Sequence, residues 1–160
     1  MTKIFAHRGA SAYAPENTME AFELAAKQGA DGIELDVHVT KDGEVVVTHD
    51  EKIDRVSNGS GFIKDMTLRE LKRLSFHNHM ESYVGVGIPT LREVLEYVST
   101  TNMDVNIELK TGIYWYPQIE EKTAFIVQET GMHDRVIYSS FNHHSIAKIK
   151  EIDSTAETAW

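Results

Sequence analysis

Two acidic side chains share one face of a short segment in which polar and apolar residues alternate. Glu34 and Asp36 alternate with branched apolar residues across 33–39, and a period of two is typical of a β-strand. Side chains two positions apart point to the same face, so the two carboxylates lie roughly 7 Å apart along the strand. Like charges that face inward side by side repel each other unless a cation lies between them. The pair therefore indicates the centre of a catalytic site.

A third carboxylate occupies the same kind of position in a second alternating segment. Glu108 lies within 104–110, where apolar and polar residues again alternate. The chain contains no cysteine, and a set of carboxylate oxygens suits Mg²⁺ or Ca²⁺ better than Zn²⁺. The alternative is that each acid pairs with a lysine or an arginine. Because the carboxylates come from two strands, we favour a divalent cation held by Glu34, Asp36 and Glu108.

Two histidines each lie at the end of a predicted strand, beside a second polar group. His7 precedes Arg8, and His49 precedes Asp50. An imidazole has an ordinary pKa near ~6.5, so it can act as a general acid or a general base at neutral pH. A single histidine is more often a structural or surface residue, but two at corresponding strand ends weaken that interpretation. His7 and His49 therefore can supply one proton donor and one proton acceptor.

Positive charge is predicted at the same end of the strands. Arg8 can hold phosphate oxygens through two parallel hydrogen bonds, and Lys110 can act as a point charge. Together with a divalent cation, the two side chains would neutralise the charge on a pentacoordinate phosphorus. The set therefore favours phosphoryl chemistry.

Two further segments contain residue types found in binding sites. The aromatic run Tyr114, Trp115 and Tyr116 follows the second acidic strand and could line a substrate pocket, although aromatic residues in such a loop more often pack. Residues 77–79 read His-Asn-His, but their flanks lack the supporting pattern of a nuclease site. We therefore keep only the aromatic run as a candidate.

Strand and helix signals alternate along the chain, which predicts a parallel sheet with helices packed on it. Because the predicted strands alternate rather than being apolar throughout, we favour a barrel, whose catalytic groups lie near the carboxyl ends of the strands. Asn17 is expected to begin the first helix, with Glu20 in a capping box. Capping boxes are also expected at Thr67 and Thr90. The expected strands are 3–6, 33–39, 45–47, 104–110 and 135–141, and the expected helices begin near 17, 67, 90, 118 and 144.

Composition limits the class of protein. The 160 residues are 41% hydrophobic and 26% charged, with a formal net charge of -9, which is typical of a globular domain. The acidic balance argues against a nucleic-acid partner, which requires a basic face. No apolar run approaches the ~18 residues of a membrane span, and the first residues do not resemble a signal peptide. We expect a cytoplasmic protein.

Seven short strings, in this order and over nearly the whole chain, resemble the glycerophosphodiester phosphodiesterase family. Each string alone is a weak signal, but the ordered set is highly specific. They are HRG (7–9), PENT (15–18), GADGIELDVHVTKDG (29–43), VVTHD (46–50), IPTL (88–91), NIELK (106–110) and SSF (139–141).

The resemblance implies an α/β fold of the TIM-type (β/α)8 barrel class and a small-molecule substrate. The implied reaction hydrolyses a glycerophosphodiester to an alcohol and glycerol 3-phosphate with Mg²⁺ or Ca²⁺, and similar enzymes are thought to use the glycerol 2-hydroxyl as the nucleophile. The implied roles are acid–base catalysis for His7 and His49, metal binding for Glu34, Asp36 and Glu108, and phosphate binding for Arg8 and Lys110.

The length of the chain leaves alternatives to a complete enzyme. A TIM barrel needs about 250 residues and eight strands, so residues 1–160 are expected to form a single partial barrel domain, about the first half, with a small insertion at about 51–88 and the approach to another strand at 156–160. The partner would be a second copy or a missing C-terminal half. One alternative function is a catalytically silent half-barrel that works by assembly with a partner. Another is a phospholipase D of the sphingomyelin type.

Overall fold

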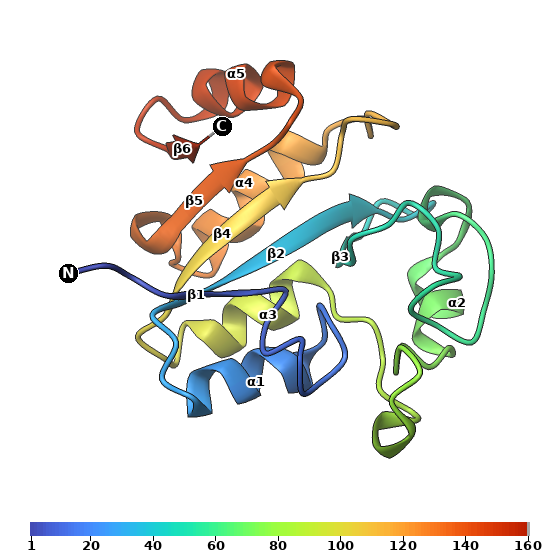
Figure 1. Ribbon diagram of the computed structural model, residues 1–160. Helices are drawn as coiled ribbons and strands as arrows, with labels where there is room; N and C mark the ends of the chain where they lie inside the picture. The colour runs from blue at the N-terminus through green and yellow to red at the C-terminus, as the bar shows by residue number, and fades with distance from the viewer. Residues whose placement is uncertain (160) are drawn as a thin grey trace.

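A parallel β-sheet forms the centre of the computed structural model, which describes residues 1–159. The parallel strands pair in the order β1-β2-β4-β5-β6, and β3 pairs with β2 in the antiparallel direction. In Figure 1 the colours advance from blue at β1 to red at β6 across this sheet. The strands are β1 (Phe5–His7), β2 (Gly32–Val39), β3 (Val45–Val47), β4 (Asp104–Leu109), β5 (Val136–Ser139) and β6 (Glu157–Ala159).

Helices alternate with the parallel strands, which is the arrangement of the first part of a TIM-type barrel. No helix within residues 1–159 is both long enough and apolar enough to cross a membrane. The helices are α1 (Met19–Lys27), α2 (Leu68–Lys72), α3 (Leu91–Val98), α4 (Ile119–Glu129) and α5 (His143–Ile152), with short 3₁₀ turns η1 (Ile63–Asp65), η2 (Glu81–Tyr83) and η3 (His133–Arg135).

The two faces of the central strands differ, as the alternating sequence predicts. Ile33 and Leu35 of β2 and Ile107 of β4 are fully buried in one core with Phe22 of α1 and Leu95 of α3. Burying each such side chain contributes about 1.5–3 kcal/mol to the stability of the fold. The polar residues between them therefore lie on the opposite face, which is the inner side of the partial barrel.

Two of the three expected capping boxes are present. Thr67 accepts a hydrogen bond from the backbone of Glu70 and begins α2, and Thr90 does the same with Glu93 at α3. In both, the glutamate side chain returns to the N-cap backbone, which satisfies two of the free amides at the helix start.

The expected start of the first helix is wrong by one residue. Thr18 is the N-cap of α1, because its hydroxyl accepts from the backbone of Ala21. Ala21 therefore occupies the position that Glu20 was expected to fill, and the capping box is absent. Asn17 instead adopts a left-handed backbone with φ of 56° and points its amide elsewhere, as described below.

Residues 51–88 form a separate, less regular segment. They contain η1, α2 and η2 and pack around a second, smaller apolar cluster that is joined to the sheet through Val46 of β3. That this segment is an insertion into the barrel stays a prediction. At the other end, the expected strand at 156–160 corresponds to β6, and Trp160 lies outside the described residues.

Candidate active site

Three carboxylates meet where β2 and β4 run side by side. Asp36 is paired in register with Glu108, and Glu34 lies two residues earlier on the same face of β2. Because of this register, one oxygen from each side chain comes within 4.8 Å of the others. The expected convergence of the three acids is therefore present, although their role in metal binding stays a prediction.

Asp36 is the buried member of this cluster. Its Oδ2 accepts a hydrogen bond from Asn17 Nδ2 at 3.0 Å, while its Oδ1 has no hydrogen-bond partner among residues 1–159. Burial, together with the nearby carboxylates of Glu108 and Glu34, raises the pKa of Asp36 to about 8. A buried carboxylate oxygen without a partner is costly unless a proton or a ligand satisfies it.

This donor set fits a hard divalent cation. The grouped ligand atoms are all carboxylate oxygens, which is the chemistry that Mg²⁺ and Ca²⁺ prefer. Because Asp36 Oδ1 has no hydrogen-bond partner among residues 1–159, this carboxylate keeps an oxygen available to a ligand. A dication would also offset the repulsion that raises the pKa of this carboxyl group.

The side chain of His49 is the first member of a chain of hydrogen-bonded charged groups. Its Nδ1 lies 2.7 Å from Asp50 Oδ1, and Arg55 Nε donates to the other oxygen of Asp50 at 2.9 Å. Arg55 also donates to Glu16 at 2.6 Å, and Glu16 accepts from Arg8 Nη1 at 2.9 Å. Hydrogen bonding from Arg55, reinforced by His49, lowers the pKa of Asp50 to about 2. Since an ionised carboxylate only accepts, His49 Nδ1 carries a proton.

The other nitrogen of His49 faces Lys110. Lys110 Nζ lies 3.3 Å from His49 Nε2 and 4.0 Å from Glu108 Oε1. An ammonium group only donates hydrogen bonds, so this contact requires a lone pair on Nε2. Both contacts of the ring therefore agree on a single tautomer, in which Nε2 can accept a proton.

Arg8 has an unusual backbone and an unused donor. Its φ is 57°, a conformation that costs a non-glycine residue energy and is often found at functional sites. The backbone amide donates to the Glu34 carbonyl at 2.9 Å, which holds this conformation. The side-chain Nε is buried without a hydrogen-bond partner among residues 1–159, and it lies 3.7 Å from Asp36 Oδ2.

His7 is the most exposed member of the predicted set. It is the last residue of β1, in register with Glu34 of β2. Its Nε2 lies 3.7 Å from Glu34 Oε2, and its side chain is 69% exposed. The imidazole is therefore free to contact a molecule that enters from solvent.

A cavity of about 380 Å³ joins these residues. It lies at the carboxyl ends of the parallel strands, where a barrel of this type places its catalytic groups. Asp36, which is buried, is not among the residues that line this cavity. The lining residues are the predicted His7, Arg8, Glu34, His49, Glu108 and Lys110, together with Asn106, Ser139, Ser140, Phe141 and Ala159.

The three aromatic candidates lie outside this lining. Tyr116 is 2% exposed, and its hydroxyl lies 2.6 Å from His38 Nδ1. Trp115 donates to Glu120 at 2.7 Å and stacks on a histidine of α5, while Tyr114 packs edge-on against Tyr116. A role for them in a substrate pocket stays a prediction, and the contacts of Tyr116 suggest a different one below.

A sequence profile described as the glycerophosphoryl diester phosphodiesterase family matches residues 7–159. The chain belongs to this family. It is 51% identical over 152 residues to a glycerophosphodiester phosphodiesterase from Caldanaerobacter subterraneus subsp. tengcongensis, which covers 94% of this chain and 63% of that protein. It is 50% identical over 161 residues to one from Bacillus altitudinis, covering 99% of this chain and 66% of the other.

Solved structures of the phosphodiesterase family have the same fold. The glycerophosphodiester phosphodiesterase from Agrobacterium tumefaciens is 37% identical, with a TM-score of 0.90 over 99% of this chain and 66% of its own. A phosphodiesterase from Oleispira antarctica, in complex with the product sn-glycerol-3-phosphate, is 32% identical, with a TM-score of 0.89 over 99% and 65%. The chain therefore spans just under two thirds of the length of these relatives.

Sequence reasoning missed several residues that surround the candidate site. Asn17 donates to Asp36, and Glu16 accepts from Arg8. Arg55 acts one step further away, on the Asp50 that bonds His49, and His38 bonds the backbone carbonyl of His49. The PENT string contains Glu16 and Asn17 and was a signal for both. Nothing in the local sequence distinguishes Arg55 from the other charged residues of 51–88.

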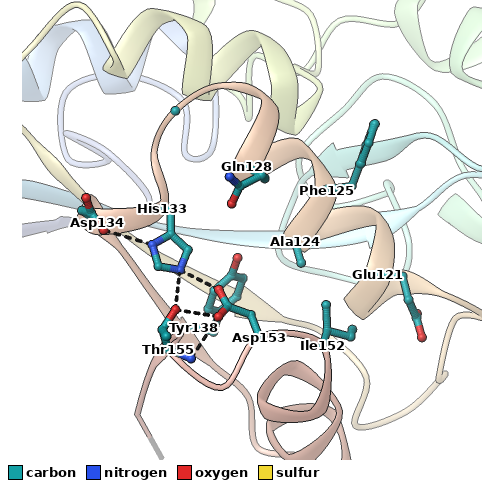
Figure 2. A pocket seen from close by; sticks show the side chains of 11 residues that line it. Glu121, Ala124, Phe125, Gln128, His133, Asp134, Tyr138, Ile152, Asp153 and Thr155 are labelled. Carbon is teal, nitrogen blue, oxygen red and sulfur yellow. Dashed lines mark hydrogen bonds and ion pairs between the residues drawn. The ribbon is translucent and has the colours of Figure 1, made fainter.

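A larger cavity lies on the outer side of the phosphodiesterase fold, between α4 and α5 (Figure 2). Its histidine, His133, is already bonded to Asp153 at 2.5 Å and to Asp134 at 3.0 Å. The hydrogen bonds that His133 donates to the carboxylates of Asp134 and Asp153 raise its pKa, which fits an ion pair that joins η3 to the end of α5. Because Tyr138 of β5 points into this cavity, its hydroxyl lies on the face opposite to the catalytic candidates.

Proposed function

We propose that this chain supplies the catalytic residues for hydrolysis of a glycerophosphodiester to an alcohol and glycerol 3-phosphate. The observation that carries the proposal is one cavity lined by two histidines, two cationic side chains and two of the three clustered carboxylates. The relatives named as glycerophosphodiester phosphodiesterases support the reaction. The Oleispira antarctica protein with bound sn-glycerol-3-phosphate supports the product.

His49 is the general base in this proposal. Its Nδ1–H faces the ionised Asp50, so Nε2 has the lone pair that removes the proton from the attacking hydroxyl. In the route that the family resemblance implies, this is the glycerol 2-hydroxyl, whose oxygen then bonds to phosphorus. Water next opens the resulting cyclic phosphate, which leaves glycerol 3-phosphate.

His7 is the general acid. Its side chain is more exposed than that of His49, so it lies where a departing alcohol would meet solvent. Its Nε2–H gives a proton to the leaving oxygen as the bond from phosphorus to that oxygen breaks. In the second half-reaction His7 takes a proton from the attacking water, and protonated His49 returns its proton to the glycerol 2-oxygen as the bond from phosphorus to that oxygen breaks, so both histidines return to their starting states.

Arg8 and Lys110 bind the phosphate. Arg8 Nε is a buried donor without a partner among residues 1–159, so a phosphate oxygen would satisfy it without breaking an existing hydrogen bond. Lys110 lines the same cavity and lies 3.3 Å from His49 Nε2, so its ammonium group would face a phosphate bound beside this histidine. Both positive charges then offset the negative charge that builds up on the phosphate oxygens in the transition state.

Glu34, Asp36 and Glu108 would hold a divalent cation, Mg²⁺ or Ca²⁺, in the same proposal. When bound, such an ion supplies Lewis-acid stabilisation of charge on the phosphate. Asn17 donates to Asp36 Oδ2, which orients this carboxylate and leaves Oδ1 available to a ligand.

The test is release of glycerol 3-phosphate from glycerophosphocholine by the 160-residue chain, followed with a coupled dehydrogenase. We expect His7→Ala and His49→Ala to remove turnover, and EDTA to remove it until Mg²⁺ or Ca²⁺ is added. His79→Asn is the control, since it removes an exposed imidazole while asparagine tolerates the local left-handed backbone.

Three outcomes would redirect the proposal. Near-full turnover in either active-site variant would remove the acid–base assignment. Binding of glycerol 3-phosphate without turnover would support the catalytically silent alternative, and the mass of the particle in solution would show whether a second copy is bound. Faster cleavage of a lysolipid than of glycerophosphocholine would support the phospholipase alternative.

A further inference from the structure

A buried histidine lies directly behind the proposed general base. His38 is 0% exposed, on the same face of β2 as Asp36 but at the end of the strand. Its Nε2 lies 2.9 Å from the backbone carbonyl oxygen of His49. A carbonyl oxygen can only accept, so Nε2 carries the proton and donates it to His49.

The second nitrogen of this ring is also bonded. His38 Nδ1 lies 2.6 Å from the hydroxyl of Tyr116, and the two rings meet edge-on at a centroid distance of 5.5 Å. In the tautomer that the His49 carbonyl requires, Nδ1 has the lone pair and the Tyr116 hydroxyl donates to it. Donation therefore runs in one direction, from Tyr116 to His38 and from His38 to the backbone of His49.

Tyr116 is itself held by the neighbouring loop and helix. Trp115 Nε1 donates to Glu120 Oε1 at 2.7 Å, and Ser145 Oγ donates to the same oxygen at 2.8 Å. Glu120 and Ser145 are buried, at 2% and 0% exposed. These hydrogen bonds tie the loop after β4 to α4 and α5 at the residue next to Tyr116, whose hydroxyl bonds His38.

His49 needs such support because it lies beyond the end of β3. The last ladder residue of β3 is Val47, and the backbone of Thr48 still donates to the carbonyl of Asp36 at 3.0 Å. His49 follows in a bend, where its carbonyl accepts from His38. The side chain is bonded to Asp50, but that contact alone leaves the main chain free to shift.

We infer that Tyr116 and His38 are positioning residues for the proposed reaction, which hold the main chain of His49 so that Nε2 faces the substrate. This inference depends on the proposed function for its catalytic meaning, while its hydrogen-bond geometry can be tested separately. It assigns Tyr116 a place behind the base instead of a place in the pocket wall.

The kinetic test compares matched variants of the 160-residue chain. Tyr116→Phe keeps the ring and removes the donor, and we expect kcat to fall about tenfold to a hundredfold with KM changed less than about twofold, as for a small displacement of a catalytic group. His38→Gln keeps one donor and one acceptor and should retain most of the activity, whereas His38→Leu should not. Tyr138→Phe is the control, because it removes a buried hydroxyl on the opposite face (Figure 2).

Two kinetic results would overturn the inference. One is a kcat for Tyr116→Phe equal to that of Tyr138→Phe. The other is an equal loss of kcat in His38→Gln and His38→Leu. Glutamine can restore both hydrogen bonds and leucine can restore neither, so equal losses would mean that His38 acts through packing alone.

A spectroscopic test decides the geometry even if turnover is absent. In long-range ¹⁵N–¹H spectra of the histidine-labelled chain, with His38→Gln used to assign the signals, we expect the Nε2–H tautomer for His38. Tyr116→Phe should disturb the signals of His38 and His49, and Tyr138→Phe should leave both unchanged. A Nδ1–H tautomer, or a His49 signal indifferent to Tyr116→Phe, would overturn the positioning role. Absence of turnover in the unmodified chain would count against the proposed function alone.

Discussion

Binding of a divalent cation to the carboxylate cluster should release a proton and should therefore tighten as pH rises. The ligand oxygens lie within 4.8 Å of one another. At that distance two unit charges repel by about 3.5 kcal/mol with an effective dielectric constant of ~20. Burial, aided by this repulsion, raises the pKa of Asp36 to about 8. At about pH 7, one unit lower, roughly nine in ten molecules would keep the shared proton.

The size of this pH dependence follows from competition between the proton on Asp36 and the cation. Below the raised pKa, the apparent dissociation constant should fall about tenfold for each unit of pH, and it should level off above that pKa. For a pKa of about 8, binding at about pH 8 should be roughly 50-fold tighter than binding at about pH 6. Each Mg²⁺ bound at about pH 7 should release ~0.9 proton.

Isothermal titration calorimetry measures both quantities. Titrating Mg²⁺ in two buffers with different enthalpies of protonation gives the number of protons released, and a series of pH values gives the slope. Asp36→Asn is the matched control, because the amide can still accept from Asn17 but cannot ionise. It should bind more weakly and without the slope. Equal affinity at about pH 6 and about pH 8 in the unmodified chain would refute the reasoning, as would a slope that survives in Asp36→Asn.

Three further predictions concern the same groups. In the metal-free chain, Asp36 binds its proton more tightly when the protein is folded than when it is unfolded. Its contribution to the free energy of unfolding should therefore fall as pH rises from its ordinary pKa of 3.8 towards about 8. Melting temperatures measured with EDTA should show this decline, and Asp36→Asn should lack it. Arg55→Met should lower kcat about tenfold, since Asp50 and Glu16 lose their shared donor; full activity in Arg55→Lys would contradict a need for the two-sided guanidinium. Asn17→Gly preserves the left-handed backbone but removes the donor to Asp36, so it should weaken Mg²⁺ binding in the same calorimetric titration, and unchanged affinity would exclude this role.

Strand positions and their inward residues were predictable because a period of two depends on local sequence alone. The alternation across β2 and β4 identified the faces on which Glu34, Asp36 and Glu108 lie. Both threonine–glutamate capping boxes were likewise local patterns, with partners three residues apart. The register that pairs Asp36 with Glu108 was not predicted, because the alternation identifies the face of each strand but not its offset from the neighbouring strand.

The residues that were missed depend on long-range geometry. Asn17 has a helix-capping residue type, and only the left-handed turn before Thr18 directs its amide to Asp36 instead. Arg55 reaches Glu16 across 39 positions of sequence, which no local pattern encodes. Tyr116 has the composition of a pocket residue, and only the position of its loop places the hydroxyl on His38.

These long-range contacts converge on the proposed base from two directions. The ring of His49 is held through Asp50, Arg55 and Glu16, and Glu16 also binds Arg8. The main chain of His49 is held separately by His38. Since Glu16 contacts both guanidinium groups, a change in how Arg8 binds phosphate would be transmitted to the orientation of the base. Phosphate binding and proton abstraction are therefore expected to respond together to changes at Glu16, and separately from changes at His38.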